Sequence, residues 1–498
     1  MYDILVIGGG INGAGIARDA AGRGLKVLLC EKDDLASHTS SASTKLIHGG
    51  LRYLEHYDFA LVRKALMERE VLLQAAPHII WPLRFVLPHH KEMRPSWLIR
   101  LGLFVYDHLG GRKILPATKT LTRKNSDVFA PLRSEFTKGF EYSDCWVEDA
   151  RLVVLNAMDA KARGATIMTR TECVSLEQAD DTWTATLKVD AATTIDIQAR
   201  AVVNAAGPWV DHIASQTGTK TNAPTVRLVK GSHIIVPKMF DDERCFFFQA
   251  GDGRIIFAIP YEDSRFTLIG TTDLQFEGDL DSVTASPEEI QYLCDVSNEY
   301  FEQQISPDDV VSTYSGVRPL FDDQAEDASS VTRDYVLKFL DQGSAPFLSV
   351  IGGKITTYRK LAEDVLKQLG GRFPQAQKPW TEKRHLPGGD IPNADFEAFE
   401  TLSAKVYPWL DANIHHRLAR TYGTCIETVL AGANSVADLG HHYGGGLYQQ
   451  EVDYLIEHEF ARTAEDIVWR RTKLGLHLTP QELEKLRDRL EEPLVAQL

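Results

Sequence analysis

Short apolar runs and small residues follow one another through the first thirty-one residues in an order that predicts strand, turn, helix and strand. Residues 3–7 are an apolar run of β-type residues, and residues 14–21 place small apolar residues at helical spacing. A second apolar run covers 25–29 and is followed by Glu31. This order is typical of the first unit of a doubly wound α/β domain with a parallel sheet.

Three glycines stand between the first predicted strand and the helix, at the spacing G-x-G-x-x-G. Gly8 permits a tight turn, Gly10 lets a pyrophosphate approach the backbone, and Gly13 lets the helix pack close to the strand. The first N–H groups of the helix can bind the anion. We expect Glu31 to accept hydrogen bonds from ribose hydroxyl groups and to disfavour a 2′-phosphate. The pattern favours a bound dinucleotide over a glycine-rich turn without a ligand.

Later segments repeat the strand and helix patterns, and the chain then continues with an antiparallel-sheet pattern and a helical one. Further predicted elements are helices over 59–76 and 151–162, strands over 165–171 and 199–204, and a strand, glycines and helix start over 350–358. Residues 226–273 contain alternating aromatic and β-branched runs joined by Gly and Asp turns, which predict an antiparallel sheet. After Pro379 the chain becomes helical and polar.

These patterns divide the chain into four parts. We predict a discontinuous dinucleotide-binding domain (1–80, 139–225 and 335–378), a basic segment (81–138), an antiparallel-sheet substrate domain (226–334) and an α-helical C-terminal domain (385–498).

The basic segment is unusual in an acidic chain. Residues 81–133 carry ten Lys or Arg and three Asp or Glu, a local charge of +7 in a chain of −15. Within 94–113, Trp97 and other apolar residues lie between the cations. A basic amphipathic segment with Trp is typical of a helix in a membrane interface. The residues alone support equally well an alternative in which the apolar side chains are core and the cations a solvated face.

Composition limits the partners, metal sites and cellular location that we expect. The acidic total argues against a nucleic-acid partner. The six cysteines are scattered and form no C-x-x-C, so we expect neither a metal site nor a disulfide framework. Met1 leads straight into the first predicted strand, and no apolar run reaches about 18 residues. We therefore expect neither a signal peptide nor a transmembrane helix, and a cytoplasmic setting.

Four cations stand in glycine-rich or turn contexts: Arg52, Arg318, Arg333 and Lys354. Any one alone would be an ordinary surface residue. Arg offers a two-pronged fork to phosphate oxygens and Lys a point charge. The four together favour one pocket for a phosphorylated substrate.

Three segments carry a resemblance to a known family: Ile7–Gly24, Ser40–Phe59 and Gly352–Ala362. Over nearly its whole length the chain resembles the FAD-dependent glycerol-3-phosphate dehydrogenases of the aerobic, quinone-linked kind. The resemblance implies an FAD-binding domain of the D-amino-acid-oxidase/glutathione-reductase type. It also implies oxidation of sn-glycerol 3-phosphate to dihydroxyacetone phosphate, within glycerol and glycerophospholipid catabolism.

The resemblance implies partners and a location as well. The electrons would pass to a membrane quinone, ubiquinone or menaquinone. The protein would attach peripherally, through 94–113, to the cytoplasmic face of the inner membrane. The oligomeric state is left open, with a homodimer as one option.

Motifs and resemblance together assign roles to residues. Those expected to contact FAD are Gly8, Gly10, Ile11, Asn12, Gly13, Glu31, Ser40, Ser41, Ser43, Thr44, His48, Gly49, Gly50, Val174, Ala206, Gly207, Gly353, Lys354, Ile355 and Thr356. Those expected to contact substrate are Arg52, Tyr53, Arg318, Arg333 and Lys354. We expect His233 to take the hydroxyl proton, with His48 as second candidate, and Arg318 to stabilise the developing alkoxide.

Other functions stay open on the same residues. An amine or amino-acid oxidase of this fold would need one Arg for a carboxylate instead of a cluster. An oxygen-using glycerol-3-phosphate oxidase would carry an additional insertion, for which this length leaves no room. A flavoprotein that binds nucleic acid and a non-catalytic dinucleotide-binding regulator are the remaining alternatives.

Overall fold

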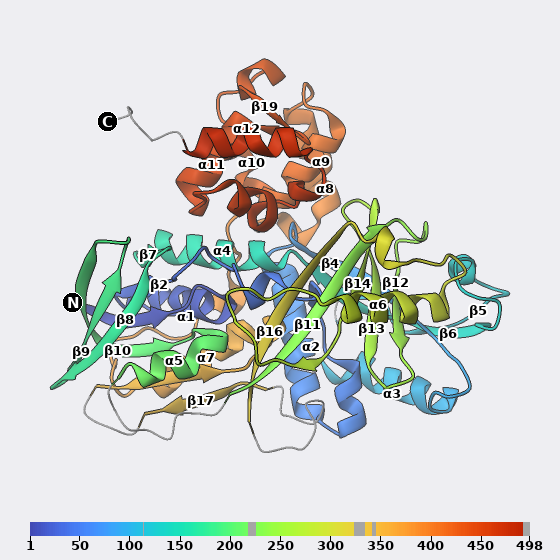
Figure 1. Cartoon of the computed structure of the whole chain (residues 1–498), viewed down its shortest axis with the longest axis horizontal. Coiled ribbons are helices and arrows are strands. Elements are labelled where there is room, and N and C mark those ends of the chain that lie inside the picture. The colour runs from blue at the N-terminus through green and yellow to red at the C-terminus, as the bar shows by residue number, and fades with distance from the viewer. Residues whose placement is uncertain (113, 218–225, 323–333, 341–344, 492–498) are drawn as a thin grey trace.

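The computed structural model describes residues 1–112, 114–217, 226–322, 334–340 and 345–491. Figure 1 shows a domain built on one sheet near the N-terminus, a second sheet beside it, and a helical C-terminal domain above both. The expected site residue Arg333 lies outside the described residues.

The first sheet is the parallel sheet that the opening pattern predicts. Its path runs β17-β18-β10-β1-β2-β7, with β9 added to β10 and β8 to β9. The β1, β2, β7, β10 and β18 pairs are parallel, and β17 closes one edge antiparallel. Its strands are β1 (Tyr2–Ile7), β2 (Val27–Cys30), β7 (Thr166–Met168), β8 (Glu172–Ala179), β9 (Thr182–Lys188), β10 (Thr194–Asn204), β17 (Val336–Phe339) and β18 (Phe347–Ile351).

Helices pack tightly on this sheet. They are α1 (Ile11–Gly22), α4 (Asp149–Ala162), α5 (Val210–Ser215) and α7 (Tyr358–Gln368). Helix α1 lies between α4 and α7. A Cβ on Gly15 would stand 2.6 Å from the ring of Tyr358, so the small residues of α1 are needed for this close packing. The predicted strand, turn, helix and strand over the first thirty-one residues are confirmed.

The second sheet follows the path β15-β11-β14-β13-β12-β4-β6-β3, with β16 paired to β11 and β5 to β6. Its strands are β3 (Leu46–Ile47), β4 (Ile80–Pro88), β5 (Lys119–Thr122), β6 (Lys138–Val147), β11 (Val226–Pro237), β12 (Cys245–Gln249), β13 (Ile255–Tyr261), β14 (Phe266–Gly270), β15 (Leu274–Gln275) and β16 (Ser312–Phe321). Helix α6 (Pro287–Tyr300) packs on it through an apolar cluster. The pairs among β11, β13 and β14 are antiparallel, as predicted.

The predicted boundaries of the second sheet were wrong on its N-terminal side. Strands β4, β5 and β6 belong to this sheet, so 81–138 is not a separate segment and the start of 139–225 is not part of the dinucleotide domain. The charge count obscured the strand pattern, although some of these cations belong to the strands themselves. Arg84 of β4, for example, donates through Nε to Glu141 of β6 at 3.0 Å.

Two helices lie beside the second sheet. Helix α2 (Phe59–Ala75) confirms the predicted helix over 59–76. Helix α3 (Ser96–Leu109) follows β4 and buries Leu103 and Tyr106. The remaining residues of α3 are half-buried or exposed, so the helix presents most of its surface outward.

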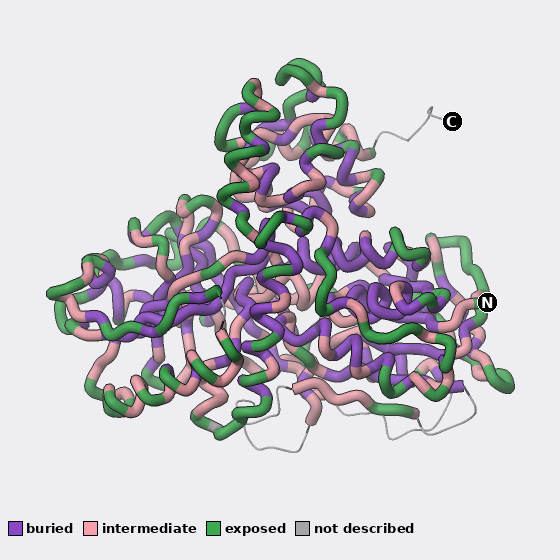
Figure 2. The backbone as a smooth tube through the Cα atoms, turned by 180° about the vertical axis from the view of Figure 1, so that it is seen from behind, coloured by how far each residue is buried: buried purple, intermediate pink, exposed green. Residues whose placement is uncertain are grey.

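The C-terminal domain is helical, as predicted. Its helices are α8 (Phe396–Val406), α9 (Ala412–Tyr422), α10 (Ile426–Val429), α11 (Gln449–Glu459) and α12 (Pro480–Glu491), with a π-helical turn at Asp466–Arg471 and a small hairpin of β19 (His442–Gly444) and β20 (Leu447–Tyr448). Figure 2 shows buried backbone along both sheets and inside this domain. Within the described ranges, no helix combines the length and apolarity needed to cross a membrane.

Candidate active site

A cavity of about 840 Å³ is lined by residues of both sheets and of the loops between them. Residues of the G-x-G-x-x-G turn and Glu31 line it, and so do Arg52, Arg318 and Lys354. Distant parts of the sequence thus meet in one site, large enough for a dinucleotide and a small substrate.

The glycine turn has the geometry that the spacing predicts. Gly8 has φ +112°, and a Cβ there would stand 2.5 Å from the carbonyl oxygen of Ala205. A Cβ on Gly13 would stand 1.9 Å from the carbonyl oxygen of Gly8. Gly10 and the first residues of α1, Ile11 and Asn12, line the cavity. Glycine is therefore required both for the turn and for the approach of the helix, and the start of α1 faces the cavity.

Glu31 follows β2 directly, and its carboxylate turns back on the glycine turn. Its Oε2 accepts from the backbone N–H of Gly9 at 2.6 Å, and its Oε1 accepts from that of Asp33 at 2.9 Å. Burial raises the pKa of Glu31, while those two N–H groups lower it. The carboxylate is held at the cavity wall, with room for further donors at its oxygens.

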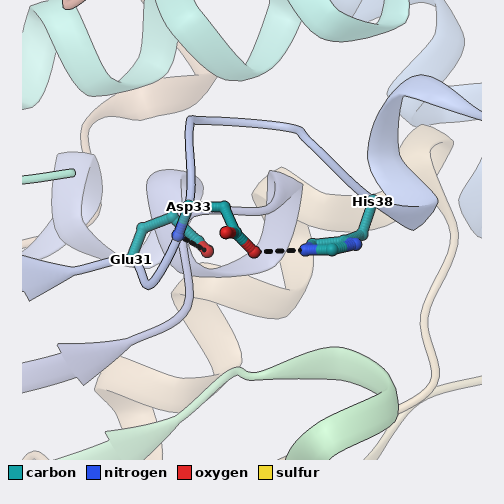
Figure 3. Close-up of side chains that lie close together, drawn as sticks. All are labelled: Glu31, Asp33 and His38. Carbon is teal, nitrogen blue, oxygen red and sulfur yellow. Dashed lines mark hydrogen bonds and ion pairs between the residues drawn. The ribbon is translucent and has the colours of Figure 1, made fainter. Parts of the chain in front are cut away.

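His38 also lines the cavity, and Asp33 pairs with it, as Figure 3 shows. His38 Nε2 lies 2.7 Å from Asp33 Oδ2, and this hydrogen bond is the main cause of the lowered pKa of Asp33. The ring of His38 lies 4.5 Å from that of Trp209, centroid to centroid. Glu31, Asp33 and His38 offer atoms within 4.8 Å of one another, but both Glu31 oxygens already accept backbone N–H groups.

Three predicted cations line the same cavity. Arg52 and Tyr53 come from the 3₁₀ helix Leu51–His56, Arg318 from β16, and Lys354 follows β18. Lys354 Nζ lies 3.6 Å from the Tyr53 ring centroid. Arg318 NH1 donates to Asp273 Oδ1 at 3.1 Å, and Asp273 lines the cavity too. The three cations border one cavity, an arrangement suited to an anionic group.

The two candidate histidines occupy different positions. His48 lines the cavity, and its backbone N–H donates to Thr356 Oγ1 at 3.2 Å. His233 of β11 is buried behind the wall, where its Nε2 lies 2.9 Å from Thr44 Oγ1 and its ring stacks on Tyr314. Burial, with the charges of Arg318 and Lys45, holds the pKa of His233 well below its usual range. His233 is therefore neutral near pH 7, and its ring bonds to Thr44, which lines the cavity.

Most of the predicted cofactor-contacting residues line this cavity, and some lie just behind it. Those lining it are Gly8, Gly10, Ile11, Asn12, Glu31, Ser40, Ser43, Thr44, His48, Gly50, Ala206, Gly207, Gly353, Lys354 and Ile355. Those absent from its wall are Gly13, Ser41, Gly49, Val174 and Thr356.

The structure shows where three of the residues absent from the cavity wall lie. Val174 is 37% exposed and lies at a register shift of β8 between Cys173, which lines the cavity, and Ser175, so the contact expected through its backbone stays a prediction. The N–H of Gly49 donates to Tyr106 Oη at 2.8 Å and is buried. Thr356 is fully buried and supports His48 from behind.

Sequence reasoning missed several lining residues. Asp273, Thr39 and Trp209 border the cavity, together with Arg254 and Phe257 of the β12–β13 hairpin region. Asp273 follows β14 closely, and an acid just after a strand was the one available signal. The others lie in turns and strands where the sequence pattern does not separate a wall residue from a surface residue.

Comparisons with known proteins agree with this geometry. The family described as "FAD dependent oxidoreductase" matches residues 3–359, and the "C-terminal domain of alpha-glycerophosphate oxidase" matches 379–491. The chain is 54% identical to a glycerol-3-phosphate dehydrogenase of Pseudomonas aeruginosa, covering 99% of this chain and 95% of the relative. It is 54% identical to a D-erythritol 1-phosphate dehydrogenase of Brucella abortus, covering 96% of each.

A further relative and a solved structure extend these likenesses. The aerobic glycerol-3-phosphate dehydrogenase of Escherichia coli is 47% identical, covering 98% of this chain and 97% of the relative. The structure of the glycerol-3-phosphate dehydrogenase from Bacillus halodurans complexed with FAD has a TM-score of 0.77 at 29% identity, covering 100% of this chain and 97% of the other. The glycine cradle and the cavity fit FAD. The chain therefore belongs to the FAD-dependent oxidoreductase family, as an FAD enzyme whose helical C-terminal domain is of the alpha-glycerophosphate oxidase type.

Proposed function

We propose that this enzyme oxidises sn-glycerol 3-phosphate to dihydroxyacetone phosphate and passes the electrons to a membrane quinone. The observation that carries the proposal is that Arg52, Arg318 and Lys354 line the same cavity as the dinucleotide cradle. A phosphate dianion needs such a cationic group, whereas a carboxylate substrate needs only one Arg. Close relatives named as glycerol-3-phosphate dehydrogenases support this choice.

The residues of the cavity have different proposed roles, which follow from their positions. When bound, FAD supplies the acceptor for the hydrogen at C2 and its electron pair. The start of α1 and Glu31 would hold the pyrophosphate and ribose. Arg52 and Lys354 would hold the substrate phosphate, with Tyr53 orienting it. Arg318 would stabilise the alkoxide as the hydroxyl proton leaves.

The proton acceptor is one of two histidines. His48 faces the cavity directly, whereas His233 reaches it through the Thr44 hydroxyl. A base must lie within hydrogen-bond reach of the proton that it takes. This geometry reverses the order that the sequence suggested, and we propose His48 as the base. We propose that His233 holds Thr44 in place.

Single variants separate these roles. His48→Ala should lower turnover by about 10²- to 10⁴-fold, the usual contribution of a general base. Thr44→Val and His233→Ala should have matching, smaller effects if they act as one unit. A large loss in His233→Ala with near-normal turnover in His48→Ala would return the base to His233.

Anaerobic titration tests the reaction itself. The purified yellow protein should bleach on addition of glycerol 3-phosphate and recover its colour when a ubiquinone analogue is added. No bleaching with glycerol 3-phosphate, or bleaching with glycine or a D-amino acid instead, would overturn the proposal. Recovery with oxygen as fast as with quinone would favour the oxidase alternative.

A second substrate has specific support. The 54% identity to a D-erythritol 1-phosphate dehydrogenase equals that to the Pseudomonas enzyme. The two substrates share a phosphate and a secondary alcohol and differ by one hydroxymethylene unit. Comparing kcat/KM for both in the same assay decides which one this chain prefers.

We also propose that α3 attaches the enzyme to the membrane surface. Trp97, Leu101 and Phe104 are 68%, 51% and 54% exposed, and Tyr57 is exposed nearby. Helices α2 and α3 contact each other on the side of the molecule away from the C-terminal domain (Figure 1). An amphipathic helix with an outward Trp buries such a face in the interface of a bilayer, here the cytoplasmic face of the inner membrane.

Vesicle sedimentation tests this attachment. Replacing Trp97, Leu101 and Phe104 with Ser should release the protein from anionic vesicles. The matched control replaces Leu402 and Val406, which are equally exposed on α8 of the C-terminal domain. Equal binding by both variants would contradict the assignment of this face.

A further inference from the structure

Two chain segments form part of the cavity wall. Loop 31–38 follows β2, and turn 169–173 joins β7 to β8. Glu31 and His38 of the loop and Thr171 of the turn line the cavity. The segments are joined by backbone hydrogen bonds: the N–H of Arg170 donates to Asp33 O at 2.8 Å, and that of Thr171 to Glu31 O at 2.7 Å. They therefore form one unit of the wall.

Asp34 fixes the loop from behind. It does not line the cavity, and its side chain is only 1% exposed. Its carboxylate accepts from Arg471 NH1 at 2.6 Å and NH2 at 2.8 Å, and from Arg470 Nε at 2.6 Å. Arg471 is itself fully buried and also donates to the carbonyl oxygen of Glu459. A bidentate Arg–carboxylate pair with a second Arg fixes both position and orientation.

The turn 169–173 is fixed by the same part of the C-terminal domain. Arg170 NH2 donates to both oxygens of Asp466, at 2.9 and 2.7 Å. Asp466 also accepts from Arg470 and from the backbone N–H groups of Arg462 and Thr463. Asp466 and Arg471 are the first and last residues of one π-helical turn, a rare element that is frequent at functional sites.

We propose that this turn of the C-terminal domain, residues 466–471, is a positioning device for the FAD site. Arg471 and Arg470 act through Asp34, and Asp466 acts through Arg170. Together they hold loop 31–38 and turn 169–173 in the geometry that binds the dinucleotide part of the cofactor. A wall ordered before binding loses less conformational entropy when the ligand arrives, which strengthens binding without any direct contact. The inference rests on FAD binding and not on the identity of the substrate.

The alternative is that these ion pairs only dock one domain on another. Both readings predict a less stable protein when a partner is removed, so stability alone does not separate them. They differ for FAD affinity. Positioning requires that affinity falls selectively and that excess FAD restores turnover, whereas docking alone lowers stability without this selectivity.

The test measures FAD binding by the full-length protein. The variants are Arg471→Gln, Asp34→Asn and the double variant. FAD dissociation is followed by the fluorescence that flavin gains on release, and thermal unfolding is measured in parallel. We expect each single variant to weaken FAD binding about tenfold or more, where tenfold corresponds to about 1.4 kcal/mol. The double variant should lose less FAD affinity than the sum of the two single losses, because both singles remove the contact between Asp34 and Arg471.

Two control variants come from the same domain. Arg417→Met removes a bidentate pair with Glu451, whose two distances are both 2.7 Å, inside the C-terminal domain. It should lower the unfolding temperature and leave FAD affinity within about twofold. Arg487→Gln, on α12, removes an exposed ion pair with Glu465. It should change neither the unfolding temperature nor the FAD affinity.

The outcomes are separable. Excess FAD should restore turnover in Arg471→Gln, because the cations proposed to bind the substrate are untouched. An FAD affinity within about twofold of wild type in Arg471→Gln, or an equal loss in Arg417→Met, would overturn the proposal. If Arg471→Gln does not fold, the partly exposed Arg470→Gln and Arg170→Gln probe the same turn, and unchanged FAD affinity in both would also overturn it.

Discussion

His78 is a histidine without charge or hydrogen bonds at the junction of the dinucleotide domain and the C-terminal domain, and it should make the enzyme sensitive to mild acid. It is fully buried, and neither ring nitrogen has a hydrogen-bond partner among the described residues. Gly388 and Gly423 pack so close that a Cβ on either would come within about 3.1 Å of the ring. Burial, with the charges of Arg151 and Arg420, lowers its pKa to about 3.

The size of the effect follows from that pKa. The unfolded chain has a His pKa of 6.5, so between pH 6.5 and 3 the unfolded state binds more protons than the folded one. Stability is therefore fully present above pH 6.5 and falls as the pH decreases. From pH 7 to pH 5 the loss due to His78 is about 2 kcal/mol. That corresponds to about 2 °C if the whole chain unfolds together, and to about 8 °C if the C-terminal domain unfolds alone.

Thermal unfolding of His78→Leu at pH 7, 6 and 5 measures this contribution. The decrease in unfolding temperature between pH 7 and pH 5 should be smaller in the variant than in wild type by that amount. His441→Asn serves as a control, because His441 is exposed. Identical pH dependence in wild type and His78→Leu would refute the assignment of a neutral, unpartnered histidine at this junction.

Three further predictions concern the cradle, the substrate site and the domain junction. Lys354→Met should lower kcat/KM for glycerol 3-phosphate about 10- to 150-fold, the worth of one charged hydrogen bond, with little change in FAD content. Gly13→Ala should abolish FAD binding or folding, measured by flavin absorbance, because its Cβ would overlap Gly8 O, whereas Gly102→Ala has open space and should be neutral. Arg151→Met leaves Glu459 buried without its partner and should cost about 3–5 kcal/mol in urea unfolding; a loss under 1 kcal/mol would contradict this.

The first domain was predictable because its signals are local. The apolar run, the glycine spacing and the small residues of α1 all act within thirty residues and specify one geometry. The second sheet was predictable only in part. Its strands come from two separate regions of the chain, and β4 pairs parallel with β12 across a long sequence separation. No local pattern predicts such a pairing. Residues 81–138 were therefore interpreted from their charge, as a separate basic segment.

The site residues were likewise predictable where the signal is local and not where it depends on distant segments. The cations Arg52 and Lys354 follow glycine pairs, and that context places them correctly at the cavity. His233 is buried against Thr44, which comes from a different segment of the chain, whereas His48 lines the cavity. The support of loop 31–38 by Arg471 joins residues more than four hundred positions apart, which no spacing rule could reveal.

The interleaving of the two sheets has a consequence for how the chain is made. Strand β1 is made long before β10, with which it pairs, and before β18, which pairs with β10. Roughly 340 residues separate β1 from β18. Ribosomal synthesis of that length takes about 17 to 70 seconds. During that interval the nascent polypeptide displays an apolar edge that only later segments cover, so chaperones should engage its first half. The helical region matched over 379–491 is made after the strands of both sheets and in one piece. It is therefore the natural unit for gene fusion or exchange between relatives.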